Sequence, residues 1–359
     1  MKTIKQTSPF VRKQISTKRM MTDVLIALIP VVLFSIYRFG WDAVIRILVS
    51  VVVMVGLEAI AFGMMHKADK NESWVLRLKS RYKEYSINNL IIPAISGVIY
   101  AMLLPSKLPI YATIVGAAFG ILVGKMMFGG TGANIFNPAA VGRIFIALAL
   151  TDMFTGTYIG VDIVAGGTAL TGLKTGIGFP AILNNYSLFD VFIGNIPGSM
   201  GEISVLAILL GGSYLFIRRS ADFRGPLSAA IVFTFMIALA GLRLYPDDIF
   251  TFVLYHLFAG GLVFGAVFMI TDPVTSPVTR PGRWIYGLLI GAIVVLIRLF
   301  GAYPEGVAFA LLIGNMFVPL IDYPKWSTNK YKPTFVIGYI VVLIALGLVV
   351  YFGVGGSLS

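Results

Sequence analysis

The segment from Asp162 to Leu173, DIVAGGTALTGL, combines a glycine-rich turn with threonine hydroxyls. Glycine lets a large planar group come close to the backbone, and a threonine hydroxyl can be esterified to a phosphate. The two properties together suit a phosphate-bearing cofactor, with Thr168 and Thr171 as the candidate hydroxyls. The alternative is a flexible loop without a ligand, because Gly-Gly-Thr is by itself a weak signal.

Polar residues also interrupt otherwise apolar stretches. The turn Gly129–Pro138 contains Asn134 and Asn137, and Arg143 follows it near a helix start. Such groups are costly in lipid unless they meet partners or line a cavity. They are therefore candidates for lining a cofactor site or an ion path. Equally, the asparagines could cap the ends of broken helices.

Asp272 presents the same choice further along the chain, with Thr275 and Ser276 beside it. Asp272 could pair with Arg143, and its role would then be architectural. Glu58 lies inside an apolar run and is a candidate ion or proton ligand, because intramembrane charges are functional candidates by default. Arg46 lies in the same run, close enough to its end to reach the membrane surface.

The composition decides which elements must position these residues. Hydrophobic residues make up 58% of the 359 residues and charged residues only 12%, with a mean hydropathy of +0.89. A water-soluble fold is excluded, and runs that approach ~20 apolar residues predict spanning helices. The chain has no cysteine and two histidines, so iron–sulfur clusters and metal sites are not expected. Any redox role then requires an organic cofactor.

Eleven apolar runs predict an all-α polytopic membrane protein with ten or eleven transmembrane helices. The runs are 22–37, 43–65, 90–104, 109–128, 139–150, 203–217, 226–242, 250–270, 284–300, 307–320 and 335–354. Runs 90–104 and 139–150 are short and are expected to be half-helices. The side on which the chain ends is left open by the sequence.

The positive charges give the predicted orientation. The net charge is +12, but the basic residues gather in short loops beside apolar runs, which indicates topology signals and not nucleic-acid binding. The expected order is a cytoplasmic segment 1–21, a first helical half 22–150, an extracytoplasmic loop 151–202 that carries Thr168, and a second helical half 203–359. A loop of that length is expected to be functional.

An internal duplication is also predicted. MMFGGTGANIFNPAAVGRIF from Met126 and FMITDPVTSPVTRPGRWIYG from Phe268 each show an apolar helix, a polar turn, a Gly-Arg pair and a second helix. Paired interrupted helices of this kind are typical of duplicated membrane folds with a site between the halves. The handedness of the duplication is left open.

Three strings give the chain a resemblance to a known family: SPFVRKQISTKRMMTDVLIALIP, GGTGANIFNPAAVGRIF and TDPVTSPVTRPGRWIYG. The chain resembles the family that contains the D subunit of the Rnf complex and the B subunit of the sodium-pumping NADH:quinone reductase. It is more similar to the Rnf D subunit, because it lacks a longer N-terminal extension.

The resemblance implies a covalent flavin. In that family a threonine in an Asp-x-x-Ser/Thr-Gly-Ala-Thr pattern holds FMN through a phosphoester bond that a flavin transferase installs. The matching residues here run from Asp162 through Gly166 and Gly167 to Thr168. Thr168 is the implied attachment point, with Thr171 as the fallback, although Ala165 and Gly167 depart from the pattern. A second, non-covalent flavin such as riboflavin is also allowed by the resemblance, but no residue identifies its site.

The implied function is that of an electron-carrying subunit in the bacterial inner membrane, with a cytoplasmic N-terminus. It would belong to an ion-translocating ferredoxin:NAD⁺ oxidoreductase and would assemble with Rnf A, B, C, E and G type subunits. The flavin would supply the redox chemistry, and the subunit would be catalytically incomplete alone. Whether Na⁺ or H⁺ moves is left open. The alternative is a small-solute transporter or channel with a duplicated helical bundle.

Overall fold

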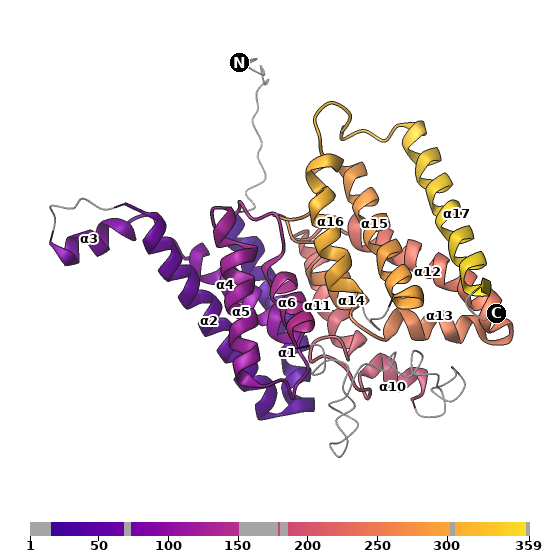
Figure 1. The fold of residues 1–359 in the computed structure, drawn as a ribbon, viewed down its shortest axis with the longest axis horizontal. Coiled ribbons are helices and arrows are strands. Elements are labelled where there is room, and N and C mark those ends of the chain that lie inside the picture. Colours follow the sequence, from indigo (N-terminus) through magenta and orange to yellow (C-terminus); the bar gives the residue numbers. More distant parts are fainter. Residues whose placement is uncertain (1–15, 68–72, 151–178, 180–185, 302–305, 357–359) are drawn as a thin grey trace.

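The structure is a computed structural model, which describes residues 16–67, 73–150, 179, 186–301 and 306–356. Within these residues it is all-helical, with fourteen α-helices, two short 3₁₀ turns and no strand (Figure 1). The helices of the N-terminal half are α1 Thr17–Phe39, α2 Trp41–Met65, α3 Trp74–Arg81, α4 Asn88–Met102, α5 Ile110–Gly124 and α6 Pro138–Ala149. Those that follow are α10 Leu188–Ile193, α11 Val205–Arg218, α12 Arg224–Leu244, α13 Ile249–Phe258, α14 Leu262–Phe268, α15 Arg280–Phe300, α16 Val307–Ile321 and α17 Pro333–Gly356.

Each predicted apolar run coincides with one helix, except run 250–270, which coincides with α13 and α14, and the helices differ in length. Six of the described helices are long and apolar enough to cross a membrane: α1, α2, α5 with its 3₁₀ extension, α12, α15 and α17. The short runs form α4 and α6, which at 1.5 Å per residue are about 22 Å and about 18 Å long. Both are shorter than a hydrocarbon core of about 30 Å. The multi-pass membrane character is therefore confirmed, while the count of ten or eleven spans stays a prediction.

The run 250–270 is not one straight helix. It is broken between α13 and α14, which meet at a bend of 50°. Gly260 at the break has a φ of +81°, a conformation that residues with a Cβ rarely adopt. The run therefore forms two helical segments that are together long and apolar enough for one broken span, a break that hydropathy does not register.

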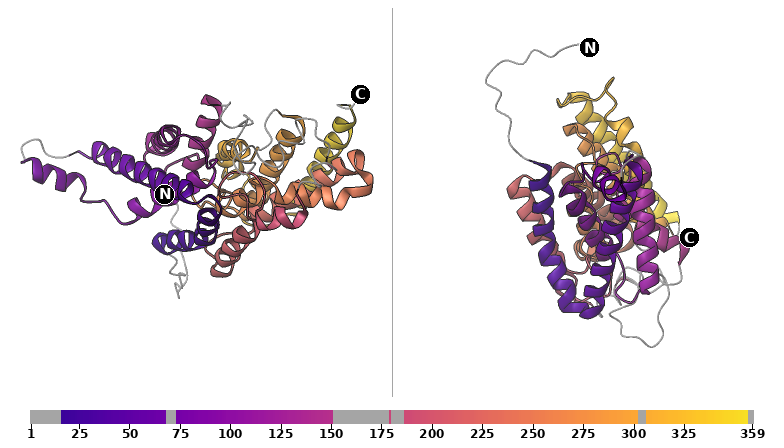
Figure 2. Two further views of the ribbon diagram at one scale, coloured as in Figure 1. Left: turned by 90° about the horizontal axis from the view of Figure 1, so that it is seen from below. Right: turned by 90° about the vertical axis from the view of Figure 1, so that its left-hand side faces the viewer.

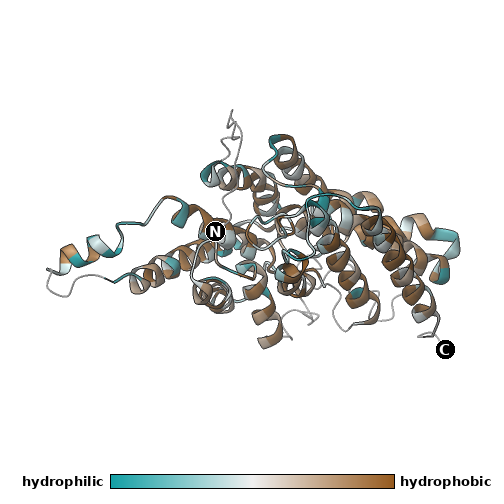
Figure 3. Cartoon of the chain, turned by 90° about the horizontal axis from the view of Figure 1, so that it is seen from above, coloured by the Kyte–Doolittle hydropathy of each residue, from teal (hydrophilic) through white to brown (hydrophobic). Residues whose placement is uncertain are grey.

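Hydrophobic residues cover the long helices, and hydrophilic residues lie mainly at their ends and on α3 (Figure 3). Helix α3 lies away from the body of the molecule (Figures 1 and 2). The residues just before α11 contact the C-terminal end of α4. There the backbone N–H of Gly201 donates to the carbonyl of Met102 at 2.7 Å, so the last residues of the predicted loop 151–202 pack against the end of α4.

Ten helical segments, with α13 and α14 counted together as one broken segment, fall into two sets with the same order of packing. In the first set α1 packs on α4, α2 packs on α4 and α5, and α5 packs on α6. In the second set α11 packs on α14, α12 packs on α13 and α15, and α15 packs on α16. Helices with the same place in each set also meet across the junction, α1 with α11 and α6 with α16. Helix α17 packs on α12 and α15, outside this scheme.

This order of packing does not match the alignment of segments proposed from the sequence. The turn after Met126 follows α5, the fourth helix of its set, whereas the turn after Phe268 follows α14, in the third place of the other set. The two segments share a local pattern because each is a polar turn between apolar helices. They do not hold equivalent positions in the packing.

Small residues allow α12 and α15 to approach closely. A Cβ on Gly287 would overlap the carbonyl oxygen of Gly225 and lie 2.6 Å from the Cβ of Ser228, and a Cβ on Gly291 would lie 2.7 Å from the carbonyl oxygen of Ala229. Helix pairs in membranes commonly use such small residues at a spacing of four to bring their backbones together.

Replacing Gly287 with Ala is therefore expected to destabilise the α12–α15 pair by about 1–3 kcal/mol, the usual effect of overpacking. Thermal unfolding of the purified protein in mild detergent measures the effect. Gly338→Ala on α17 is the matched control, since a Cβ there meets nothing within 4 Å. Equal unfolding temperatures for the two variants would contradict the close packing.

Candidate functional site

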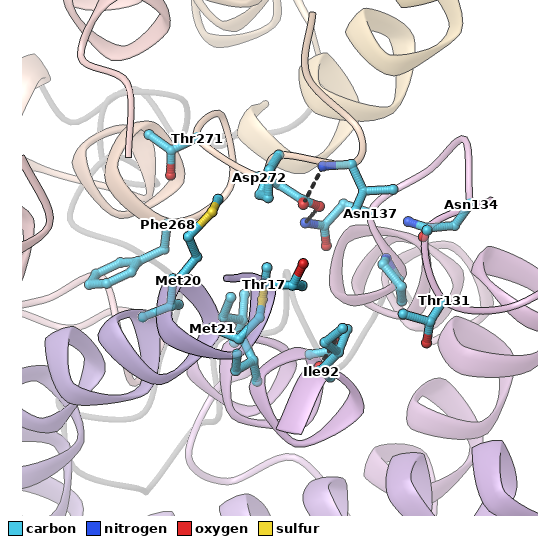
Figure 4. A pocket seen from close by; sticks show the side chains of 18 of the residues that line it. Thr17, Met20, Met21, Ile92, Thr131, Asn134, Asn137, Phe268, Thr271 and Asp272 are labelled. Carbon is cyan, nitrogen blue, oxygen red and sulfur yellow. Dashed lines mark hydrogen bonds between the residues drawn. The ribbon is translucent and has the colours of Figure 1, made fainter. Parts of the chain in front are cut away.

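A cavity of about 300 Å³ lies at the junction of the two sets of helices (Figure 4). Its apolar wall comes from α1, α4 and α14, through side chains such as Met21, Ile95 and Phe268. Its polar wall comes from the turn before α6 and the loop after α14, which bring Asn137 and Asp272 together. An apolar pocket with a few converging polar groups is the usual form of a small-molecule site.

Asn137 joins the two sets. Its side-chain oxygen accepts hydrogen bonds from the backbone N–H groups of Ala139 and Ala140, at 3.0 and 3.3 Å, and so caps the start of α6. Its Nδ2 donates to the Oδ2 of Asp272 at 3.4 Å. The capping function and the position on the cavity wall, which the sequence left as alternatives, therefore belong to the same residue.

Asn315 on α16 extends this contact into a network. Its Oδ1 accepts from the backbone N–H of Asn137 at 3.3 Å, and its Nδ2 donates to the carbonyl of Thr275 at 2.9 Å and to the hydroxyl of Tyr286 at 2.7 Å. Thr275 in turn donates from its hydroxyl to the Oδ2 of Asp272 at 3.0 Å. Asn315 is only 1% exposed, and buried networks whose groups are all partnered hold one geometry.

A buried ion pair supports the other side of the cavity. The Nζ of Lys125 lies 2.6 Å from the Oε2 of Glu58, and each side chain is only 1% exposed. The hydroxyl of Thr131 donates to the Oε1 of Glu58 at 2.9 Å. Lys125 and Thr131 line the cavity, so Glu58 fixes two of its lining side chains. Glu58 is thus already paired with an ammonium group.

Two further residues that the sequence singled out, Asn134 and Arg143, do not bond to Asp272. Asn134 is buried and donates to the carbonyl of Phe136 at 3.0 Å within its own turn. Arg143 is half-buried further along α6. The carboxylate of Asp272, which the sequence allowed to pair with Arg143, is instead held by the neutral side chains of Asn137 and Thr275.

Arg46 lies in the second turn of α2, and its Nη1 pairs with the Oδ1 of Asp42 at 3.5 Å. The arginine is only 6% exposed. Its Nε donates to the carbonyl of Leu108 at 3.1 Å, and its Nη1 donates to the carbonyl of Asp42 at 2.9 Å. The guanidinium therefore turns inward, where it supplies donors to backbone groups.

The candidate flavin attachment segment lies outside the described residues. This holds for Thr168 and Thr171, and for Asp162, Gly166 and Gly167. Phe179, eleven positions after Thr168, is described and is fully buried. Its ring contacts Tyr245, Phe252 and Tyr255, so the end of α12 and helix α13 hold the chain at this point.

Sequence reasoning missed Lys125, Asn315 and Glu202. Lys125 and Asn315 each lie inside a predicted apolar run, and an isolated cation or amide in such a run is itself a signal that a partner is needed. Glu202 ends the predicted loop 151–202. The structure buries it to 3% exposure, with its Oε1 accepting from the backbone N–H of Ser199 at 2.8 Å.

Replacing Glu58 with Gln is expected to cost about 3–5 kcal/mol of stability, because it leaves the buried Lys125 ammonium without a counter-charge. Combining it with Lys125→Met should recover most of that loss. A double-mutant cycle by denaturant unfolding in micelles measures the coupling. Lys107→Met is the control, since its pair with Asp42 is 39–50% exposed and is worth less than about 1 kcal/mol. A double variant that loses the full sum would contradict the pairing.

Comparison with known proteins gives one consistent result. The model of the NQR2, RnfD, RnfE family matches residues 4–329. The chain is 33% identical over 354 residues to the B subunit of the Na(+)-translocating NADH-quinone reductase of Ectopseudomonas mendocina, covering 89% of this chain and 87% of the relative. It is 33% identical over 350 residues to the same subunit from Chromohalobacter salexigens, covering 89% of this chain and 84% of that relative. The matched region contains the cavity and its network, and the chain belongs to the NQR2, RnfD, RnfE family.

Proposed function

We propose that this chain is the flavin-carrying membrane subunit of an ion-translocating oxidoreductase of the Rnf type. It relays electrons between ferredoxin-side and NAD-side modules while the complex moves Na⁺ or H⁺. The observation that carries this proposal is the family match over residues 4–329. Relatives named as subunits of a Na⁺-translocating NADH-quinone reductase support electron transport coupled to ion transport. Rnf A, B, C, E and G type subunits are the proposed partners in a bacterial inner membrane.

The proposed covalent cofactor is FMN, esterified to Thr168 by a flavin transferase. When bound, FMN supplies the electron-accepting and electron-donating chemistry. The chain contributes a hydroxyl in a glycine-rich turn and the buried Phe179 further along, which ties the segment to α12 and α13. The protein's own part is therefore attachment and positioning.

The junction cavity is the proposed site of a second, non-covalent flavin such as riboflavin. Its volume of about 300 Å³ falls at the lower end of the range for small-molecule pockets. The amide of Asn137, the carboxylate of Asp272 and the hydroxyl of Thr131 offer donors and acceptors to the polar edge of such a ring. The side chains of Met20, Met21 and Phe268 offer it an apolar wall.

The number of membrane crossings and their orientation are part of the same proposal. Ten helical segments crossing the membrane in two sets of five, with α17 as an eleventh crossing, would place the N-terminus in the cytoplasm and the 151–202 segment outside. The two sets would then be an inverted duplication, because the first helix of each would start on opposite sides. Packing between helices of equal rank, α1 with α11 and α6 with α16, supports this arrangement.

A solute transporter would also place a cavity between duplicated halves. The flavin content of the purified protein distinguishes the two functions, because a flavoprotein retains its flavin through purification and a transporter of this kind has none. The relatives' names, which describe subunits of an ion-translocating oxidoreductase, favour electron transport over passive solute transport.

Cells that also express the flavin transferase are expected to yield a protein band that fluoresces after denaturing electrophoresis. Thr168→Val, which removes the hydroxyl at nearly constant volume, should abolish that fluorescence. Thr171→Val is the matched control and should keep it. A wild-type band without fluorescence would contradict the covalent-flavin proposal. Fluorescence that is lost in Thr171→Val but kept in Thr168→Val would assign the attachment to Thr171.

Asn137→Leu is expected to lower the content of non-covalent flavin at least tenfold in the purified complex, since it removes a polar group of the cavity wall. The measurement is flavin extracted by acid and quantified by chromatography, with the covalent flavin of the protein band as an internal reference. Ser204→Ala is the control, because Ser204 caps α11 through the N–H of Ala207 without lining the cavity. Equal flavin loss in both variants would show that helix capping alone is responsible.

A further inference from the structure

A second cavity, of about 410 Å³, adjoins the first and has a different chemistry. It lies where the end of α11 and the starts of α12 and α15 come together. Three arginines are among its lining residues: Arg219, Arg224 and Arg283. Asp222 is the only carboxylate among the described residues that line it. Three positive charges facing one negative charge leave a net attraction for an anion.

The pairing of these side chains sets their positions. Asp222 accepts from the Nη1 of Arg224 at 2.6 Å and also from the Nη1 of Arg283. The Nε of Arg283 donates to the carbonyl of Pro277 at 3.0 Å. Two arginines are thus fixed by one carboxylate, and the Nε of Arg224 also donates to the hydroxyl of Tyr331 at 3.2 Å. The Nη2 groups of Arg224 and Arg283 have no hydrogen-bond partner among the described residues.

Arg219 differs from the other two. Its guanidinium has no hydrogen-bond or ion-pair partner within the part of the chain that the structure describes. It is also the only non-glycine residue there with a positive φ, of +57°. This left-handed conformation ends α11, where the backbone N–H of Ser220 donates to the carbonyl of Leu215 at 3.0 Å. Arg219 is exposed and lines the cavity.

The surroundings indicate what kind of anion would bind. An apolar stripe of exposed side chains runs from the cavity along α12: Phe223, Leu227 and Ile231 are 50%, 43% and 41% exposed. A spacing of four residues places them on one face of the helix. Exposed apolar residues beneath a basic cluster match a phospholipid, whose phosphate lies above its acyl chains.

We propose that the cavity between α11, α12 and α15 binds the phosphate of an anionic phospholipid through Arg219, Arg224 and Arg283, with an acyl chain along the Phe223–Leu227–Ile231 stripe. Guanidinium groups bind phosphate oxygens through paired hydrogen bonds. Basic pockets between transmembrane helices are typical sites for anionic lipid headgroups. The bound lipid would complete the packing where the loop after α14 separates the two cavities.

The test uses the full chain purified in mild detergent and titrated with dioleoyl phosphatidylglycerol, with bound lipid counted by native mass spectrometry. Arg219→Gln is expected to weaken phosphatidylglycerol binding about five- to tenfold, without changing the weaker binding of dioleoyl phosphatidylcholine. Arg219→Gly should have the same effect. Because glycine adopts the left-handed backbone freely, that variant separates loss of the guanidinium from loss of folding.

Arg19→Gln is the matched control. It removes the same charge from an exposed position on α1 that does not line the cavity, and it should bind phosphatidylglycerol as the wild type does. Equal weakening by Arg19→Gln and Arg219→Gln would overturn the proposal in favour of general surface charge. Undiminished binding in both Arg219 variants would also overturn it. A third arm adds millimolar inorganic phosphate: displacement of the lipid in proportion to the phosphate would assign the cavity to a free anion.

Discussion

The structure depends on one constraint: a chain that breaks its helices inside an apolar medium must satisfy the backbone groups that each break sets free. The carbonyl of Leu108, before α5, accepts from Arg46 on α2. The carbonyl of His256, near the end of α13, accepts from Arg298 on α15. In both places an arginine from another helix donates to a carbonyl near a helix end, and that end is thereby fixed to the helix that carries the arginine.

The junction of the two sets of helices follows the same rule, with amides in place of arginines. Asn137 satisfies the first N–H groups of α6, and Asn315 satisfies the carbonyl of Thr275. Because both asparagines also bond across the junction, the satisfaction of one helix end positions the wall of the cavity. Here the contacts that make the fold stable in lipid are the same contacts that shape the candidate cofactor site.

The two cavities differ in the charged residues that line them. The first is enclosed by apolar side chains of α1 and α4, and its polar lining consists of neutral amides, the carboxylate of Asp272 and Lys125, whose charge is paired with Glu58. The second opens where three helix ends meet and collects arginines. A ring-shaped, largely uncharged ligand suits the first cavity and an anionic headgroup the second. The loop after α14, with Thr271 and Pro273, contributes to both walls.

Sequence by itself determined the multi-pass helical character, since 58% hydrophobic residues leave no other way to bury the chain. It also located the polar residues Asn137, Asp272 and Glu58, because a polar group within an apolar run, or in a short turn between two such runs, needs a partner in lipid. Tertiary structure alone decided their partners. Asp272 meets Asn137, and Glu58 meets Lys125, because such pairs depend on how helices far apart in sequence pack. The break between α13 and α14 was likewise invisible to hydropathy, which describes the polarity of each side chain and not the direction that the backbone takes.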